Sequence, residues 1–279
     1  MTVATSETFS GHYPIEHRNG EIERLDLQAA ALAPDTEIML DRIGVREGWR
    51  CLDIGCGPGG ITDLLSARVG RSGRVLGLDM DAHFIAHAKR RAPANVEFRQ
   101  GDGFHTELPA ASFDLVHMRF VASTAGGPQR LLREAIRLTR PGGTVALQEP
   151  DTDTYNCYPS HPAWDRLKAV MIEIFERVGG DVYLAKRLYA LARQQRLQDV
   201  QYRPFFHGVR ASDPAADLLP STIESLRGSV LNFGLLTEPE LSTLLSECRA
   251  HLRNPDTVST LYTVAQVWGR TARADEVIE

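Results

Sequence analysis

The chain has 279 residues, of which 43% are hydrophobic and 24% are charged, and its formal net charge is −5. These proportions are typical of a globular protein that is long enough to bury a full core. The acidic balance argues against nonspecific attraction to nucleic acid or anionic lipid, and no apolar run approaches the roughly 20 residues of a membrane span.

The N-terminal segment shows neither the basic nor the apolar stretch of a secretory signal, so we expect a cytoplasmic protein. The four cysteines follow no zinc-ligand spacing, which predicts reduced thiols and no metal site. Apolar residues at positions i, i+3, i+7 and i+10 predict a helix over residues 21–32. Pro34 predicts a break, followed by a second short helix that ends near Gly44.

Residues 51–60 read CLDIGCGPGG, which predicts a short buried strand, a glycine-rich turn and a helix from about residue 61. Glycine lets backbone amides approach a ligand where a Cβ atom would collide. A turn of this kind between a strand and a helix marks the ligand-binding edge of an open α/β sheet.

Two kinds of ligand suit this glycine turn. Gly55, Gly57 and Gly60 satisfy the G-x-G-x-x-G pattern of dinucleotide-binding proteins. However, Pro58 removes one amide donor from the turn, and Asp53 places a carboxylate where a dianionic pyrophosphate would be repelled. The same carboxylate suits a ligand with a cationic amino-acid end. The turn alone leaves both ligands open and favours the second.

Short strands and helices alternate up to about residue 151, which predicts a parallel sheet with helices on both faces. We expect strands at residues 51–54, 74–78, 96–99, 113–118 and 144–147, a turn at 141–143, and helices from about residues 61, 84 and 128. Asp53, Asp79 and Asp102 lie at the ends of the first three strands. Because the carboxyl ends of parallel strands share one sheet edge, these carboxylates are expected to lie near the same ligand.

The second half of the chain changes to longer amphipathic segments. Apolar stripes predict helices at residues 167–178, 184–191, 219–233 and 241–252. Residues 200–209 look like a strand interrupted by Pro204, which places it near a sheet edge. Alternation over residues 260–268 predicts a final strand.

In order, these segments resemble the class I S-adenosylmethionine (SAM) dependent methyltransferases. The run of Asp53, Gly55, Gly57 and Gly59 looks like the first motif of that family. The FDLV of residues 113–116 and the RPGGTV of residues 140–145 look like its fourth-strand and fifth-strand segments. Residues 13–28 and 147–151 look like a bacterial small-molecule branch, related to the ubiquinone/menaquinone-biosynthesis-type enzymes.

The resemblance implies an α/β fold with a doubly wound, mostly parallel, Rossmann-like sheet of seven strands, the last of them antiparallel. It implies that residues 1–34 form an N-terminal lid helix and that residues 35–151 form the SAM-binding core. Residues 152–279 would complete the sheet and carry a helical insertion, at about residues 213–252, that forms a lid over the substrate.

The resemblance also implies roles for individual residues in holding SAM. Asp79 would bind the ribose hydroxyls, Asp102 would bind the adenine amino group, and Arg119 would lie at the methionine end. The cofactor-binding residues expected in this way are Gln28, Asp53, Gly55, Gly57, Gly59, Asp79, Met80, Asp102, Gly103, Phe104 and Arg119.

The catalytic residues are less clearly indicated by the sequence. Glu149, after the fifth strand, is the candidate base, and Tyr13 is a second catalytic candidate. Tyr155 and His161 are candidate substrate contacts, whereas His117 lies inside a strand and suits a hydrogen-bonded core histidine.

The functional hypothesis is methyl transfer from SAM to O, N or C of a small-molecule metabolite, with secondary metabolism as a suitable setting. The expected partner is a small-molecule acceptor, with no nucleic acid and no membrane, and a homo-oligomer is left open. An NAD(P)-dependent oxidoreductase and a SAM-binding protein without transferase activity are the alternatives.

Overall fold

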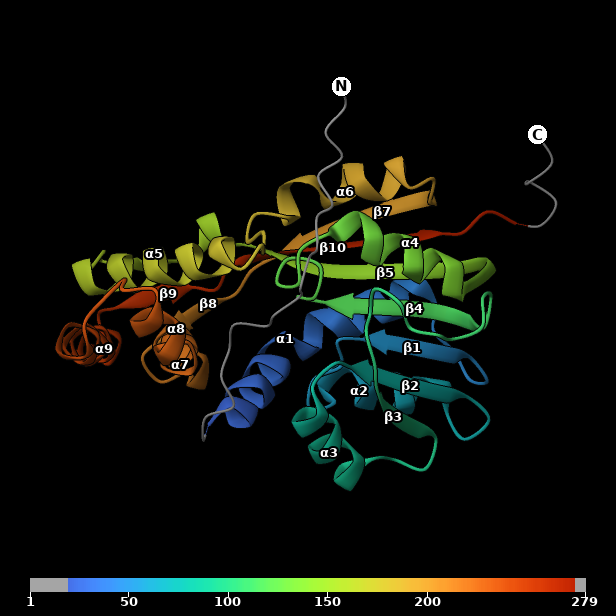
Figure 1. Cartoon of the computed structure of the whole chain (residues 1–279), viewed down its shortest axis with the longest axis horizontal. Coiled ribbons are helices and arrows are strands. Elements are labelled where there is room, and N and C mark those ends of the chain that lie inside the picture. Colours follow the sequence, from blue (N-terminus) through green and yellow to red (C-terminus); the bar gives the residue numbers. More distant parts are fainter. Residues whose placement is uncertain (1–19, 274–279) are drawn as a thin grey trace.

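The computed structural model describes residues 20–273, which form a sheet with helices on both faces (Figure 1). The sheet strands are β1 (Arg50–Ile54), β2 (Arg74–Asp79), β3 (Val96–Gln100), β4 (Phe113–Arg119), β5 (Thr139–Asp151), β7 (Gln198–Phe205) and β10 (Thr263–Arg270). Their order is β3-β2-β1-β4-β5-β10-β7. The first five of these run parallel, and β10 is antiparallel to both β5 and β7. The doubly wound, seven-stranded sheet with an antiparallel last strand is therefore confirmed.

Each face of the sheet has its own apolar core. The helices beside the sheet are α1 (Glu21–Ile43), α2 (Gly60–Val69), α3 (Ala82–Arg91), α4 (Pro128–Leu138) and α6 (Ala185–Gln194). Helices α1 and α2 pack on one face through residues such as Met39 and Leu65, while α4 and α6 pack on the other through Leu131 and Leu188. The alternation of short strands and amphipathic helices in the sequence thus produces a buried parallel sheet.

Helix α1 runs unbroken through Pro34, so the break predicted there is wrong. A proline inside a helix removes one backbone hydrogen bond and crowds the preceding turn. The surrounding contacts compensate, because Leu32 and Met39 are fully buried and the Thr36 hydroxyl lies 3.2 Å from Oε1 of Gln148 on the sheet. Tertiary packing therefore outweighs the local preference of the chain at this position.

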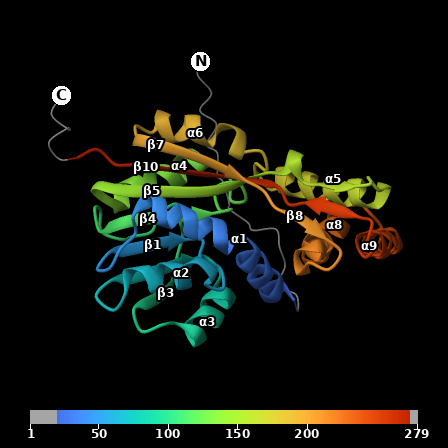
Figure 2. The same cartoon turned by 180° about the vertical axis from the view of Figure 1, so that it is seen from behind.

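A further apolar cluster lies beyond the ends of the sheet strands. It holds α5 (Pro162–Arg177), α7 (Leu218–Ser225), α8 (Arg227–Asn232), α9 (Glu238–Leu252) and a small antiparallel sheet of β6 (Asn156–Tyr158), β9 (Val258–Thr260) and β8 (Gly208–Arg210). The sequence did not predict this small sheet. Helix α1 contacts α2 at one end and α7 at the other, so it joins the two parts of the molecule (Figure 2).

Three further boundaries differ from the sequence-based expectation. The helix expected over residues 219–233 is the pair α7 and α8. Strand β5 begins at Thr139, and an irregularity in its pairing with β4 takes up the expected turn at residues 141–143. Pro204 lies within β7, which ends at Phe205, and β7 occupies a sheet edge as predicted.

In the part of the chain that the structure describes, no helix is long and apolar enough to cross a membrane.

Candidate functional site

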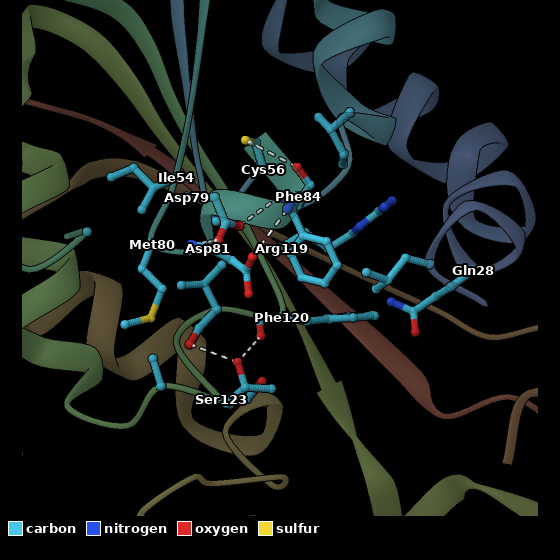
Figure 3. A pocket seen from close by; sticks show the side chains of 18 of the residues that line it. Gln28, Ile54, Cys56, Asp79, Met80, Asp81, Phe84, Arg119, Phe120 and Ser123 are labelled. Atoms are coloured by element: carbon cyan, nitrogen blue, oxygen red, sulfur yellow. Dashed lines mark hydrogen bonds between the residues drawn. The ribbon is translucent and has the colours of Figure 1, made fainter. Parts of the chain in front are cut away.

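A cavity of about 330 Å³ lies at the carboxyl ends of the central strands. Ligands of open α/β sheets bind at this edge. Its walls come from the glycine turn, the ends of β2 and β3, the loop after β4, and helices α1, α5 and α7 (Figure 3). Of the residues predicted to bind the cofactor, those that line it are Gln28, Asp53, Gly55, Gly57, Asp79, Met80, Asp102, Gly103, Phe104 and Arg119. The structure therefore gathers these predicted residues around one cavity.

The glycine turn depends on positive φ angles and, at Gly55, also on a close contact that only glycine tolerates. Gly55 has φ of +69°, and a Cβ atom built on it would lie 2.2 Å from Cγ2 of Val121. Gly57 also has a positive φ, +53°, but a Cβ atom there would meet nothing within 4 Å. Gly59, with φ of +110°, lies outside the cavity lining and precedes the first residue of α2. Gly55 thus packs against the loop after β4, while the turn leaves open space beside Gly57.

Asp79 joins the end of β2 to the glycine turn. Its Oδ2 accepts a hydrogen bond from the Gly57 backbone N–H at 2.8 Å, and its Oδ1 accepts one from the Asp81 backbone N–H at 2.9 Å. Burial raises the pKa of Asp79, while these two backbone donors act in the opposite direction. Each carboxylate oxygen retains a second lone pair, so Asp79 can still accept hydrogen bonds from a ligand.

Asp53 lies beneath the turn and is buried, with 2% of its surface exposed. Its Oδ1 lies 2.7 Å from Nδ1 of His117 on the neighbouring strand. His117 is fully buried, and its Nε2 lies 2.9 Å from Nε2 of Gln148. The interpretation of His117 as a hydrogen-bonded core histidine is therefore confirmed, although the sequence did not reveal its contact with Asp53.

The outer end of the cavity is shaped by residues after β2 and β3. The Asp102 side chain is exposed, and its Oδ1 accepts a hydrogen bond from the Phe104 backbone N–H at 2.8 Å. The Arg130 guanidinium lies 4.9 Å from the centre of the Phe104 ring. Met80 is 54% exposed although it lines the cavity. Met80 and Phe104 line the same cavity, and an exposed apolar side chain and an aromatic ring are suited to a flat ligand.

Arg119 brings a positive charge to the inner side of the turn. Burial lowers the pKa of its guanidinium, and nearby Asp53 and Tyr262 act in the opposite direction. Within residues 20–273, no side chain forms a salt bridge with Arg119. Figure 3 shows Arg119 of β4 in the cavity lining, together with Asp79 of β2 and Gln28 of α1.

The structure places one of the two catalytic candidates, Glu149, outside the cavity lining. Tyr13 lies outside the described residues. Glu149 is fully buried. Its two carboxylate oxygens accept hydrogen bonds from the backbone N–H groups of Ala122, at 3.0 Å, and Ser123, at 3.1 Å. Burial raises the pKa of Glu149 to about 7, although these amides lower it. Ser123 lines the cavity and Glu149 does not, so the carboxyl supports the cavity wall from behind.

The two substrate-contact candidates differ in position. Tyr155 lines the cavity and packs edge-on against Tyr262 and Trp164, with ring centres 5.4 Å and 4.9 Å apart. His161 does not line it. That imidazole caps the first turn of α5 and stacks on His251 with ring centres 4.6 Å apart.

The sequence did not predict a further set of lining residues, which we call the inner wall. These residues are Arg24, Phe120, Met171, Phe175, Val182, Leu218, Thr222 and Tyr262. Most come from apolar stripes, and a stripe does not reveal whether its side chains face a core or a cavity. Arg24 is itself nearly buried, and it pairs with Glu21 at 2.7 Å.

The described residues contain no group of three or more His, Cys, Asp or Glu side chains that could hold a metal ion. The four cysteines are free and buried, and Cys56 lines the cavity.

Comparisons with known proteins agree with the geometry. Residues 52–147 match a family model described as a methyltransferase domain. An uncharacterized 37.1 kDa protein in transposon TN4556 of Streptomyces fradiae is 32% identical over 177 residues, which cover 62% of this chain and 50% of that protein. An arsenite methyltransferase of Aquipseudomonas alcaligenes is 34% identical over 148 residues, which cover 49% of this chain and 41% of the relative.

A similar solved structure is phosphoethanolamine N-methyltransferase 2 of Haemonchus contortus in complex with S-adenosyl-L-methionine, with a TM-score of 0.52 and 17% identity. The match covers 86% of this chain and 53% of that one, and it shows the shared fold. This chain spans at most about half the length of the curated relatives named above.

Proposed function

We propose that this chain is a class I, SAM-dependent methyltransferase that transfers the methyl group of SAM to a small molecule. The match of residues 52–147 to a methyltransferase domain and the order of the sheet strands support this. One observation carries the proposal. The glycine turn, held by Asp79, and the buried Asp53 carboxylate face the same cavity at the switch point of the sheet.

The chemistry of the lining residues suits SAM from one end to the other. Asp79 is proposed to accept hydrogen bonds from the two ribose hydroxyls. Asp53 is proposed to face the ammonium of the methionine part of SAM. Arg119 is proposed to face the carboxylate of that part, where a guanidinium provides two parallel donors. The remaining proposed contacts are Asp102, Met80, Gly103 and Phe104 around the adenine, Gln28 from α1, and Gly55 and Gly57 of the turn. Gly59, which lies outside the lining, is proposed to act by shaping the turn before α2.

A nicotinamide cofactor suits the same lining less well. Its pyrophosphate would need amide donors at the turn and no negative charge near it. Pro58 lacks a donor, and the Asp53 carboxylate lies in the cavity lining below the turn. The oxidoreductase alternative is therefore not favoured.

When bound, SAM supplies a methyl group that its sulfonium has already activated. The chain's own contribution is then mainly alignment and exclusion of water. Glu149 is proposed to act by holding the backbone of Ala122 and Ser123, rather than by touching the acceptor. Tyr13 stays a catalytic prediction.

The inner half of the cavity is proposed to hold the acceptor. Its walls are largely apolar, through Met171, Phe175 and Leu218, with the phenol groups of Tyr155 and Tyr262 between them. Arsenite is the acceptor of one relative, but Cys56 is the one cysteine among the described lining residues. Thiol-dependent capture of arsenite is therefore disfavoured, and a partly apolar organic metabolite is the proposed acceptor.

The remaining predictions concern organisation and setting. We propose that the segment up to residue 34 and the insertion at about residues 213–252 act as lids over a core at residues 35–151. Contact between α1 and α7 beside the cavity supports this division. A cytoplasmic location and the absence of nucleic-acid and membrane partners remain predictions, and a homo-oligomer is left open.

The experiment that tests the function is a panel of small organic acceptors incubated with SAM and the full chain. The readout is S-adenosylhomocysteine formed above the level of acceptor-free controls. The Asp79→Ala variant serves as the matched negative control. A wild-type chain that binds SAM but yields no product across a broad panel would favour the alternative of a SAM-binding protein without transferase activity.

A further inference from the structure

A row of polar side chains crosses the sheet behind the cofactor site. It consists of Asp53 on β1, His117 on β4, Gln148 on β5, Gln266 on β10 and Arg203 on β7. Asp53 and His117 are paired residues of neighbouring strands, and Gln266 is paired with both Gln148 and Arg203. Side chains of paired residues lie on the same face of a sheet. His117 is paired with Ala146, two residues before Gln148, so His117 and Gln148 also share this face, and their side chains lie 2.9 Å apart.

The hydrogen bonds at one end of the row fix the orientation of Gln266. Its Oε1 lies 2.9 Å from Nη1 of Arg203, and a guanidinium can only donate. Its Nε2 lies 2.9 Å from the backbone carbonyl of Asp35, which can only accept. The second proton of that Nε2 therefore points to Oε1 of Gln148, also at 2.9 Å.

This orientation determines the protonation of His117. Because Oε1 of Gln148 accepts, its Nε2 donates, and the group it faces at 2.9 Å is Nε2 of His117. That nitrogen must be an unprotonated acceptor, so the single ring proton of a neutral His117 lies on Nδ1. Nδ1 then donates to Oδ1 of Asp53 at 2.7 Å, and Asp53 accepts this bond as a carboxylate.

From this geometry we propose that His117 is a positioning residue for the cofactor, acting through Asp53. It holds one carboxylate oxygen, and the other remains available to the cavity that Asp53 lines. A buried carboxylate without that donor would lose the hydrogen bond that holds it in place. The inference rests on the proposed function, and it assigns the ammonium of the methionine part of SAM as the group that depends on His117.

The test compares two ligands and two substitutions. S-adenosylhomocysteine carries the ammonium, whereas 5′-methylthioadenosine keeps the adenosine and lacks the amino-acid part. In His117→Asn the amide nitrogen can take the place of Nδ1 and donate to Asp53. In His117→Gln the amide lies at the Nε2 end, so the contact with Gln148 is kept and the donor to Asp53 is lost.

Calorimetric titration of the full chain should give a clear pattern. We expect His117→Gln to weaken S-adenosylhomocysteine binding by about tenfold or more, since a charge-assisted hydrogen bond is lost. We expect His117→Asn to stay within about threefold of wild type, and 5′-methylthioadenosine to bind all three chains within about twofold. In an Asp53→Asn background, His117→Gln should cause no additional loss.

Two results would overturn the assignment. One is unchanged binding of S-adenosylhomocysteine in His117→Gln. The other is an equal loss for both ligands, which would mean that His117 supports the fold without acting through Asp53. The proposed function fails separately, and the assignment with it, if the wild-type chain binds neither ligand.

Discussion

The carboxylate of Asp79 accepts a hydrogen bond from the backbone N–H of Gly57 at 2.8 Å, although the two residues are 22 positions apart in the chain. This bond ties the end of β2 to the glycine turn that follows β1. A side chain proposed to hold the ribose thus also sets the position of the backbone beside the methionine part. One substitution there should disturb both ends of the site.

Replacing Asp79 should therefore weaken the binding of SAM strongly. Asp79→Ala removes the ribose acceptors and leaves the Gly57 amide without its partner, so we expect a loss of about 10- to 100-fold in affinity. Titration calorimetry measures it. Asp114→Ala is the matched control, because that carboxylate pairs with Arg140 outside the cavity lining. Equal affinities for the two variants would refute the ribose assignment.

Gly55 is predicted to tolerate no side chain. In Gly55→Ala the new Cβ atom would lie 2.2 Å from Cγ2 of Val121, and φ of +69° would be strained. We expect the unfolding free energy to fall by about 1–3 kcal/mol and SAM binding to weaken. Gly57→Ala has the positive φ without the clash, so it should be the milder variant in urea unfolding. The reverse order would contradict the packing described here.

Glu149 should make stability depend on pH. Its pKa in the folded chain is about 7, above its ordinary value of 4.5, so the folded state holds this proton more tightly than the unfolded chain does. The stabilisation that this bound proton gives to the folded state is fully present below about pH 4.5. It is lost as the pH rises through 7, which lowers the free energy of unfolding by on the order of 3 kcal/mol. Urea unfolding of wild type and Glu149→Gln between pH 5 and about 8 measures the difference. A constant difference between the two chains would rule out this titration.

Tyr262 offers a test of the acceptor half of the cavity. Its hydroxyl forms no hydrogen bond with any described residue, and burial raises its pKa to about 12, so it stays a donor. Tyr262→Phe should leave the unfolding free energy within about 0.5 kcal/mol of wild type. We expect S-adenosylhomocysteine affinity to be retained and the KM of an identified acceptor to rise. Tyr202→Phe, at an exposed site on β7, is the control. Loss of S-adenosylhomocysteine binding in Tyr262→Phe would place that hydroxyl at the cofactor instead.

The sequence predicted best what depends on local pattern. Gly55, Gly57, Asp79 and Asp102 were found because turns and strand ends need particular residues at fixed spacing, and they line the cavity. Pro34 was misread because packing on both sides of α1 overrides its local effect.

Contacts between distant segments were beyond the sequence. Glu149 was the candidate base after the fifth strand, yet its carboxylate accepts a hydrogen bond from the backbone of the loop after β4 and lies behind the cavity lining. The link from His117 to Asp53 depends on strand register, which no local pattern encodes.

The central claim is that this cavity binds SAM, and calorimetric titration of the full chain with SAM and, separately, with NAD tests it most directly. We expect one-to-one binding of SAM that Asp79→Ala weakens, with no measurable heat from NAD. Binding of NAD without binding of SAM would contradict it.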